Sequence, residues 1–202
     1  RRLAKCERAL EGPDKPLSLI LPARTIAELQ RLLKVGGKAH VSHNERQVGF
    51  TIDIPKNDEG LVDRIQLVSK VVEGNYPNYR QVIPKEAGSK VRLEREKLLD
   101  SVTRAALMCD DRNNTIRLSV SKKNQNLEIS AKSDSGDSHE PIAVKYDGPD
   151  VNIAFNPQYV VEPLKAVTED EIDFEFKDDM SPGVIRGLKE DFLCVVMPQR
   201  IS

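Results

Sequence analysis

The stretch Phe192-Leu-Cys-Val-Val-Met-Pro-Gln-Arg-Ile-Ser202 ends the chain with an apolar run and a short basic tail. An unbroken apolar run of this kind is typical of a strand that is buried on both faces. The Met197-Pro198 step should end that strand, because proline has no amide hydrogen for the next ladder bond. The stretch therefore predicts a docked strand followed by a tail that is free to contact another molecule.

Upstream of this strand, hydrophobic periodicity and turn residues predict the same order of elements three times: a strand, a helix and three further strands. The helices begin at Pro22, at Arg95 and at Asn156-Pro157, and the first ends at Gly36-Gly37. Turn-forming clusters lie at 11–16 and 56–60. The predicted strands cover residues 17–21, 38–42, 47–54 and 63–72, then 90–93, 115–121, 126–132 and 141–146, then 151–155, 171–176, 184–188 and 192–197.

Equivalent helix positions support the repeat. The fifth and the twelfth residue after each opening strand are core-type residues in every round, namely Ile26, Leu98 and Val160, then Leu33, Ala105 and Val167. Repeated units of this kind bury their apolar faces against a neighbour. The predicted fold class is therefore α+β, made of strand-helix-three-strand half-domains with the helices on one side of antiparallel sheets.

The first ten residues alternate in the manner of a strand, so the chain reads as if it were cut from something longer. The connector 74–84 contains two prolines that hold it away from helix. We predict half of one domain in residues 1–84 and a complete domain in residues 85–202.

Composition favours a soluble globular protein and argues against several classes of function. Of the 202 residues, 39% are hydrophobic and 31% are charged, which is enough apolar matter for a core. Aromatic residues make up 4%, with no Trp, so a base-stacking surface is not expected. The formal net charge of -1 means that acidic surfaces must balance any basic one.

Cys6, Cys109 and Cys194 form an odd set without CxxC spacing. That pattern predicts reduced, buried thiols in a cytoplasmic protein rather than disulfides or a zinc site. No apolar run reaches the roughly 20 residues that span a bilayer, so no membrane partner is expected.

Signatures of catalysis and metal binding are sparse, and we predict no catalytic residue, metal ligand or cofactor. Gly36-Gly37-Lys38 follows a helix and lacks the upstream glycine of a phosphate-binding loop. His40 and His43 have no carboxylate or thiol at ligand spacing. Three acidic clusters fit turns better than cation sites, namely 110–111, 134–138 and 178–179. A small α+β enzyme that uses these Asp-rich turns for a metal or a phosphate stays the alternative.

Each predicted helix also carries basic residues away from its apolar side. A solvated outer face explains them if each helix is considered alone. If the repeats place their helices side by side, the residues merge into one stripe that could follow a phosphate backbone. The candidate DNA-facing residues are Arg24, Arg31, Lys34, Lys97, Arg104 and Lys165.

Four segments carry a resemblance to a known family: Arg1-Arg2-Leu3-Ala4, Gly74-Asn-Tyr-Pro-Asn-Tyr-Arg-Gln-Val-Ile-Pro84, Asn156-Pro-Gln-Tyr-Val160 and Val195-Val-Met-Pro-Gln-Arg200. They closely resemble the bacterial sliding clamp, the beta subunit of DNA polymerase III holoenzyme. The resemblance implies three similar domains per subunit and a head-to-tail homodimeric ring, with helices around the hole and sheets outside. It further implies a non-catalytic processivity factor that encircles duplex DNA and tethers DNA polymerase III, clamp-loader subunits and other proteins with clamp-binding motifs.

Against that pattern, this chain would hold the second half of the middle domain and the whole last domain, and it should not close a ring alone. A module that only binds peptides is therefore a third hypothesis. Pro163, inside the third helix, is expected to kink or shorten it, at a cost of about 3 kcal/mol if nothing compensates.

The resemblance also implies a partner-binding pocket between the middle and last domains, which accepts short motifs with hydrophobic anchors. Val195 and Met197 should share a strand face that points into this groove. Two positions depart from the family: Gln81 stands where a basic residue is expected, and Gln199 stands where a second Met is expected. The peptide preference should therefore differ. Carried onto matching positions, the pocket would be lined by Arg1, Arg2, Leu3, Pro77, Gln81, Val82, Val195, Val196, Met197, Pro198 and Arg200.

Overall fold

The computed structural model describes residues 1–9, 16–54, 63–85, 88–110, 113–134, 136–189 and 191–200. Two compact units make up the chain: unit 1 contains Arg1–Leu10 and Asn78–Ser202, and unit 2 contains Glu11–Pro77. The turns predicted at 11–16 and 56–60 lie, apart from Pro16, outside the described residues. The domain boundary at residue 84 stays a prediction.

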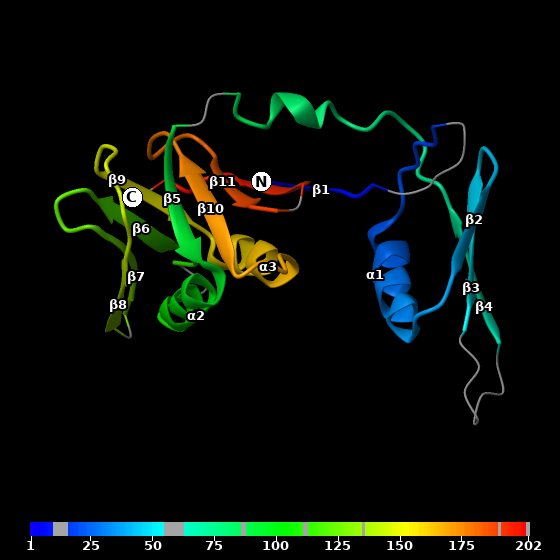
Figure 1. Ribbon diagram of the computed structural model, residues 1–202, viewed down its shortest axis with the longest axis horizontal. Coiled ribbons are helices and arrows are strands. Elements are labelled where there is room, and N and C mark those ends of the chain that lie inside the picture. Colours follow the sequence, from blue (N-terminus) through cyan, green and yellow to red (C-terminus); the bar gives the residue numbers. More distant parts are fainter. Residues whose placement is uncertain are drawn as a thin grey trace. The chain divides into compact units, whose positions relative to one another are not determined.

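Unit 1 contains two antiparallel sheets (Figure 1). The five-stranded sheet has the order β1 (Arg2–Glu7), β12 (Asp191–Val196), β11 (Gly183–Gly187), β10 (Glu171–Phe176) and β5 (Ser89–Glu94). The four-stranded sheet has the order β8 (Gly136–Ala143), β7 (Asn126–Ser133), β6 (Ile116–Ser121) and β9 (Val151–Phe155). All pairs of neighbouring strands are antiparallel, as the predicted fold class requires.

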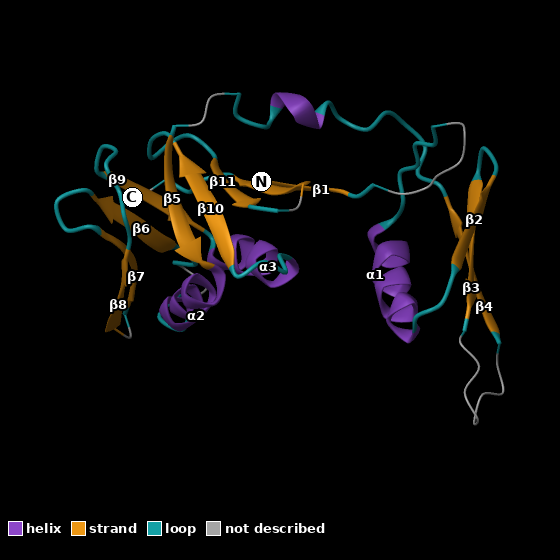
Figure 2. Ribbon diagram, viewed as in Figure 1, coloured by secondary structure: helices purple, strands orange, loops and turns teal. Residues whose placement is uncertain are grey.

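The helices α2 (Arg95–Ala106) and α3 (Pro157–Ala166) lie side by side on one side of these sheets (Figure 2). The start of α3 is confirmed, because the Asn156 side chain accepts a hydrogen bond from the amide of Gln158 at 2.9 Å. Pro163 lies inside α3, which ends three residues later at Ala166. The amide of Val167 then donates to the carbonyl of Pro163 at 3.0 Å and closes the last turn.

The two halves of unit 1 exchange their first strands. β5 precedes α2 in the chain but pairs with β10, while β9 precedes α3 but pairs with β6. Each half therefore completes the sheet of the other, and one continuous core forms between the sheets and the helices. Its largest fully buried side chains include Phe155, Phe176, Leu98, Ile116, Leu118, Ile129, Ile153, Leu164, Ile172 and Ile185.

Unit 2 is a single half of the same kind. Its helix α1 (Ala23–Leu32) continues into a 3-10 turn (Leu33–Val35) and ends as predicted at two glycines with positive φ, Gly36 at 84° and Gly37 at 99°. A hydrogen bond of 2.7 Å between the hydroxyls of Thr25 and Ser69 joins α1 to the sheet. The sheet order is β2 (Ala39–His43), β3 (Gln47–Asp53) and β4 (Arg64–Lys70).

Two strand predictions need correction. Residues 17–21 form no strand; within them, the Ile20 carbonyl accepts one hydrogen bond, from the amide of Val72 at 2.9 Å. The strand predicted at 141–146 is β8 at Gly136–Ala143. The Asp, Ser and Gly residues before Pro141 suggested a longer turn, but most of them pair in register with β7.

The repeat positions of α1 also behave differently from their equivalents. Leu98 and Val160 are buried, whereas Ile26 is 41% exposed and Leu33 is 48% exposed. The cause is packing: α2 and α3 cover one another, but the described part of unit 2 contains no second long helix to cover α1.

The three thiols were predicted to be buried, and only one is. Cys6 is exposed near the end of the edge strand β1, Cys109 is half-buried and Cys194 is buried. Burial raises the pKa of the Cys194 thiol to about 11, so this thiol stays protonated at neutral pH.

Leu98 and Leu107 give a matched test of this packing, because Leu98 is 1% exposed and Leu107, at the end of α2, is 75% exposed. Leu98→Ala should lower the free energy of unfolding by about 3–5 kcal/mol, since the truncation leaves a cavity in the core. Leu107→Ala should change it by less than about 0.5 kcal/mol. Equilibrium urea unfolding measures both values, and equal losses would contradict the burial of Leu98.

Candidate partner-binding site

The C-terminal strand β12 is a central strand of the five-stranded sheet. β1 pairs with it on one side and β11 on the other, so that Val195 lies opposite both Leu3 and Val184. Strand alternation directs Phe192, Cys194 and Val196 into the main core. Leu193 and Val195 point to the outer face, and the predicted two-sided burial of this strand is confirmed.

The outer face of β12 carries a small apolar cluster. Val184, Leu193 and Val195 are buried there, with Leu3 and Ile83 packed against them. Ile83 follows a 3-10 turn (Tyr79–Gln81) in the connector, which ends with a hydrogen bond of 3.0 Å from the amide of Val82 to the carbonyl of Tyr79. The packing of Ile83 and this turn therefore hold Val82 beside the outer face of the sheet.

A groove of about 380 Å³ opens beside this cluster. Val82, which is 47% exposed, lies in its wall. An apolar side chain that entered the groove would cover Val82 and release water from it, which is the main source of affinity at such sites. The lining residues are Gln81, Val82, Pro84, Lys85 and Gly88 from the segment before β5, Glu175, Phe176 and Val184 from the sheet, and Lys177, Ser181 and Pro182 from the loop between β10 and β11.

A larger hollow of about 1100 Å³ lies at the end of β12. Four of the pocket residues implied by the resemblance meet there, namely Arg1, Met197, Pro198 and Arg200. Tyr159 of α3 and polar residues of the four-stranded sheet complete its wall. Met197 is 40% exposed and can contact a ligand directly.

The tail after β12 is held in place. The amide of Met197 donates to the carbonyl of Arg1 at 3.0 Å, and the amide of Gln199 donates to the carbonyl of Ala154 at 2.8 Å. The hydroxyl of Thr115 lies 2.9 Å from the side-chain oxygen of Gln199. Residues 197–200 are thus held in place as part of the wall, and their contact with another molecule stays a prediction.

The remaining pocket residues occupy different places. Val196 faces the main core, and Val195 is fully buried beneath its neighbours, so neither contributes exposed surface. The guanidinium of Arg2 lies 4.9 Å from the centre of the Tyr159 ring and forms an ion pair with Glu162. Pro77 is exposed and belongs to unit 2.

Tyr159 was missed by the sequence interpretation, although it lies in the quoted segment at the start of α3. Its position in the first turn, after the Asn156 cap and Pro157, places it on the side of the helix that faces Arg2. The contact between Tyr159 and Arg2 depends on how α3 is rotated about its axis relative to β1. The sequence alone does not specify this rotation.

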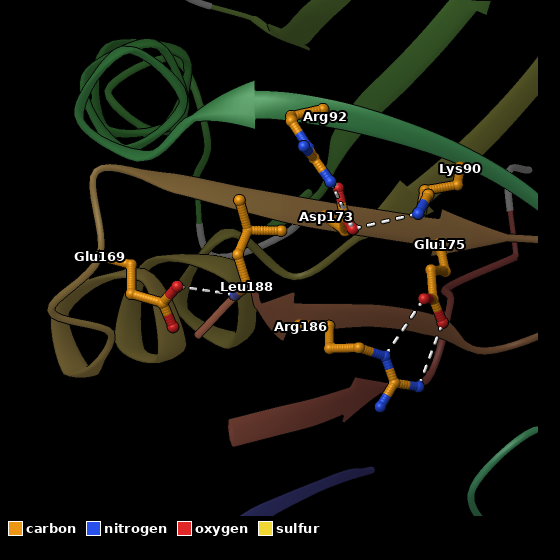
Figure 3. A network of polar contacts seen from close by, with 7 residues as sticks. All are labelled: Lys90, Arg92, Glu169, Asp173, Glu175, Arg186 and Leu188. Atoms are coloured by element: carbon orange, nitrogen blue, oxygen red, sulfur yellow. Dashed lines mark hydrogen bonds and ion pairs between the residues drawn. The ribbon is translucent and has the colours of Figure 1, made fainter. Parts of the chain in front are cut away.

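Polar residues cover the part of the outer face next to the groove (Figure 3). The carboxylate of Asp173 is 8% exposed and lies 3.2 Å from the ammonium of Lys90 and 3.0 Å from Nε of Arg92. Glu175 and Arg186 pair at 3.1 Å. Burial would raise the pKa of Asp173, but the hydrogen bonds from Arg92 and Lys90 outweigh it and hold that pKa below its usual value.

Asp173→Asn should lower the free energy of unfolding by about 1–2 kcal/mol at neutral pH, because an amide cannot replace a carboxylate shared by two half-exposed cations. Since the folded pKa is depressed, the contribution should be complete above the unfolded pKa of about 3.9 and disappear as pH falls through the lower folded value. Urea unfolding at a series of pH values measures the difference between the two proteins.

Asp147→Asn serves as the control, since this exposed carboxylate lies between β8 and β9. A difference between Asp173→Asn and the unaltered protein that persisted unchanged in strong acid would contradict the role assigned to Asp173.

The candidate DNA-facing residues lie on exposed parts of the helices. Some of them form ion pairs with carboxylates, which leaves their charges less available to DNA. Arg31 pairs with Glu28. Lys97 pairs with Glu94 at 2.7 Å, and Arg104 with Glu140 of β8 at 2.7 Å. Within the described part of the chain, no carboxylate lies within ion-pair distance of Arg24, Lys34 or Lys165.

Two of the acidic clusters act as turns where the structure describes them, whereas residues 136–138 of the third belong to β8. The carboxylate of Asp178 accepts hydrogen bonds from the amides of Met180 at 3.0 Å and Ser181 at 2.6 Å, and bonding to Ser181 and Met180 lowers its pKa. Asp110 accepts from the amide of Asn113 at 2.7 Å, whereas Asp111 lies outside the described residues. Among the described residues, no three His, Cys, Asp or Glu side chains are grouped as a metal site, and no helix is long and apolar enough to cross a membrane.

Solved structures place this architecture in a known class. A sliding clamp from Bacillus subtilis matches the whole chain with a TM-score of 0.86 and 26% identity, and the match covers 52% of that clamp. A clamp from Pseudomonas aeruginosa, bound to griselimycin, matches 99% of the chain with a TM-score of 0.85 and 26% identity, over 52% of its own length. The fold is therefore that of a DNA polymerase sliding clamp.

Sequence comparison identifies the family. The profile of the family described as "DNA polymerase III beta subunit, C-terminal domain" matches residues 80–200, and the chain belongs to this family. The beta sliding clamp of Synechococcus elongatus is 30% identical over 187 residues, and that of Bacillus subtilis is 28% identical over 205 residues. These matches cover 92% and 98% of the chain but 48% and 51% of the relatives, so the chain spans about half their length.

Proposed function

We propose that the chain serves as part of a non-catalytic processivity factor of DNA replication. In this role it belongs to a cytoplasmic, head-to-tail homodimeric ring that encircles duplex DNA and tethers DNA polymerase III, the clamp loader and other proteins through short peptide motifs. The observation that carries the proposal is the meeting of Arg1, Met197, Pro198 and Arg200 with Tyr159 in one hollow at the end of β12.

Two hollows, the groove beside Val82 and the larger hollow at the end of β12, suit a short linear motif. The groove beside Val82 is lined in part by apolar side chains, and the larger hollow combines Met197 and Tyr159 with donors that can orient a peptide backbone. Val184 belongs both to the outer cluster with Leu193 and Val195 and to the wall of the groove, so the cluster holds that part of the wall in place. A relative from Pseudomonas aeruginosa binds griselimycin. We propose that this chain also binds griselimycin, at the two hollows described above.

Truncation of the exposed apolar residues should weaken peptide binding. Met197→Ala and Val82→Ala should each lower the affinity for a peptide with Leu and Phe anchors about 5- to 20-fold, because buried interface side chains contribute roughly 1–2 kcal/mol. Fluorescence anisotropy with a labelled peptide measures the change. Leu107→Ala is the control that should leave affinity unaltered, and unchanged affinity in both test variants would refute the assignment of the pocket.

The proposed DNA contacts depend on the unpaired helix cations. Arg24→Glu and Lys165→Glu should each weaken the binding of duplex DNA irrespective of its sequence and reduce the salt dependence, by about one unit of slope for each cation removed. A filter-binding titration at several salt concentrations measures the slope. Lys123→Glu, in the loop between β6 and β7, is the matched control; an equal effect of this variant would contradict the assignment to the helices.

A further inference from the structure

The larger hollow has a polar half that the peptide pocket implied by the family resemblance does not include. It lies over the exposed face of the four-stranded sheet, where Ala154, Arg117, Ser130 and His139 are successive register partners across β9, β6, β7 and β8. Neighbouring strands are about 4.8 Å apart, so this row extends the hollow by roughly 14 Å from the tail toward β8. Lys132, two residues after Ser130, lies on the same face.

Among the described residues, the cations of this half have no carboxylate within ion-pair distance. In unit 1, the other described strand arginines are ion-paired, namely Arg2 with Glu162, Arg92 with Asp173 and Arg186 with Glu175. Among the residues that the structure describes, neither Arg117 nor Lys132 has a carboxylate within ion-pair distance, and the same holds for Arg1 and Arg200 in the same hollow. The hollow therefore gathers four uncompensated cations in a chain whose net charge is -1.

The acidic groups nearby are engaged elsewhere. Asp137 is the one carboxylate among the described lining residues, and it lies 3.2 Å from Nε2 of His139. Glu128 approaches the other ring nitrogen at 2.9 Å. The imidazole of His139 thus contacts both carboxylates at the β8 end, and the hydrogen bond to Glu128 raises its pKa. Neither carboxylate lies within ion-pair distance of Arg117 or Lys132.

We propose that the polar half of the hollow binds acidic residues that flank the hydrophobic anchors of a partner peptide. The anchors lie against Tyr159 and Met197, and the flanking Asp or Glu side chains cross the sheet to Arg117 and Lys132. The inference rests on the proposed function, because it assumes that peptides occupy the same hollow. It adds a charge preference to the partners: those with an acidic flank bind more tightly than those with a neutral one.

The hollow favours a peptide over the phosphates of DNA. Its cations share a wall with Tyr159, Met197 and Pro198, and these side chains gain affinity only from an apolar ligand group. The hydroxyl of Ser130 adds a short-range donor that suits a carboxylate. The side-chain amide of Asn113 donates one hydrogen to the carbonyl of Lys132 at 2.7 Å and has a second one. One ligand that carries both apolar and acidic groups satisfies the whole surface.

The test compares three fluorescein-labelled peptides with the same Leu and Phe anchors. One peptide has Gly-Ser flanks, the second has three Glu residues on the N-terminal side of the anchors, and the third has three Glu residues on the C-terminal side. The 202-residue chain should bind the better of the two acidic peptides about 5- to 20-fold more tightly at low salt. This advantage should shrink toward unity near 1 M salt, where the screening length falls to about 3 Å.

The double variant Arg117→Glu, Lys132→Glu should remove the advantage of the acidic peptide while leaving the affinity of the neutral peptide within about twofold. The control Lys122→Glu, Lys123→Glu changes the same charge at the far end of β6 and should retain the advantage. If the neutral peptide binds but the acidic flank gives no advantage, or the advantage survives in the double variant, the inference is overturned and the proposed function stands. If none of the three peptides binds, the proposed function fails with it.

A labelled DNA duplex completes the experiment. The inference predicts that duplex binding responds equally to the double variant and to the control. Selective loss of duplex binding in the double variant, without loss of the acidic advantage, would assign this face to nucleic acid and overturn the inference.

Discussion

The pairing of β12 between β1 and β11 is the constraint on which the candidate site depends. This register places Leu3, Val184 and Val195 together on the outer face, and it leaves Met197 as the first residue beyond the strand. The proline that follows ends the ladder, and the hydrogen bonds of the tail to Arg1 and Ala154 then hold it against the four-stranded sheet. The register thus places Val195 beside Val184, which lines the groove, and the residues that follow the strand form one wall of the larger hollow.

The exchange of β5 and β9 between the two halves of unit 1 explains why this arrangement is firm. Neither half closes its own sheet, so separating them would expose Phe155, Leu93 and Ile172 at once. The exchange also brings α2 and α3 together on one side, which leaves the outer faces of both sheets for other contacts. The same topology therefore buries the inner faces of the sheets in the core and leaves their outer faces for partner binding.

Much of the fold could be predicted from the sequence because its signals are local. β9 and β10 have the predicted bounds, since each is a continuous run between turn residues, and the start of α3 follows from Asn156 and Pro157. Residues 17–21 have the same apolar character but no strand beside them in the described chain. Their conformation depends on a partner strand, which local propensity does not report.

The site was less predictable, because it depends on register and helix phase. The resemblance supplied Arg1, Met197 and Arg200, which do meet, but it also supplied Val196, which strand alternation turns into the core. Arg117 and Lys132 carry no sequence motif, and they come together only through the pairing of β6 with β7. The register between two strands has to be known before such a cluster can be recognised, and here it comes from the structure.

The most direct measurement of the central claim is a nuclear magnetic resonance titration of the chain labelled with ¹³C at its methionine methyl groups. The sequence has three methionines, Met108, Met180 and Met197, so each signal can be assigned by single substitution. Addition of the Leu-Phe anchor peptide should shift the Met197 signal in proportion to occupancy and leave Met180 unaltered. A saturable shift confined to Met180, or saturable binding with no change at Met197, would contradict a partner site at the end of β12.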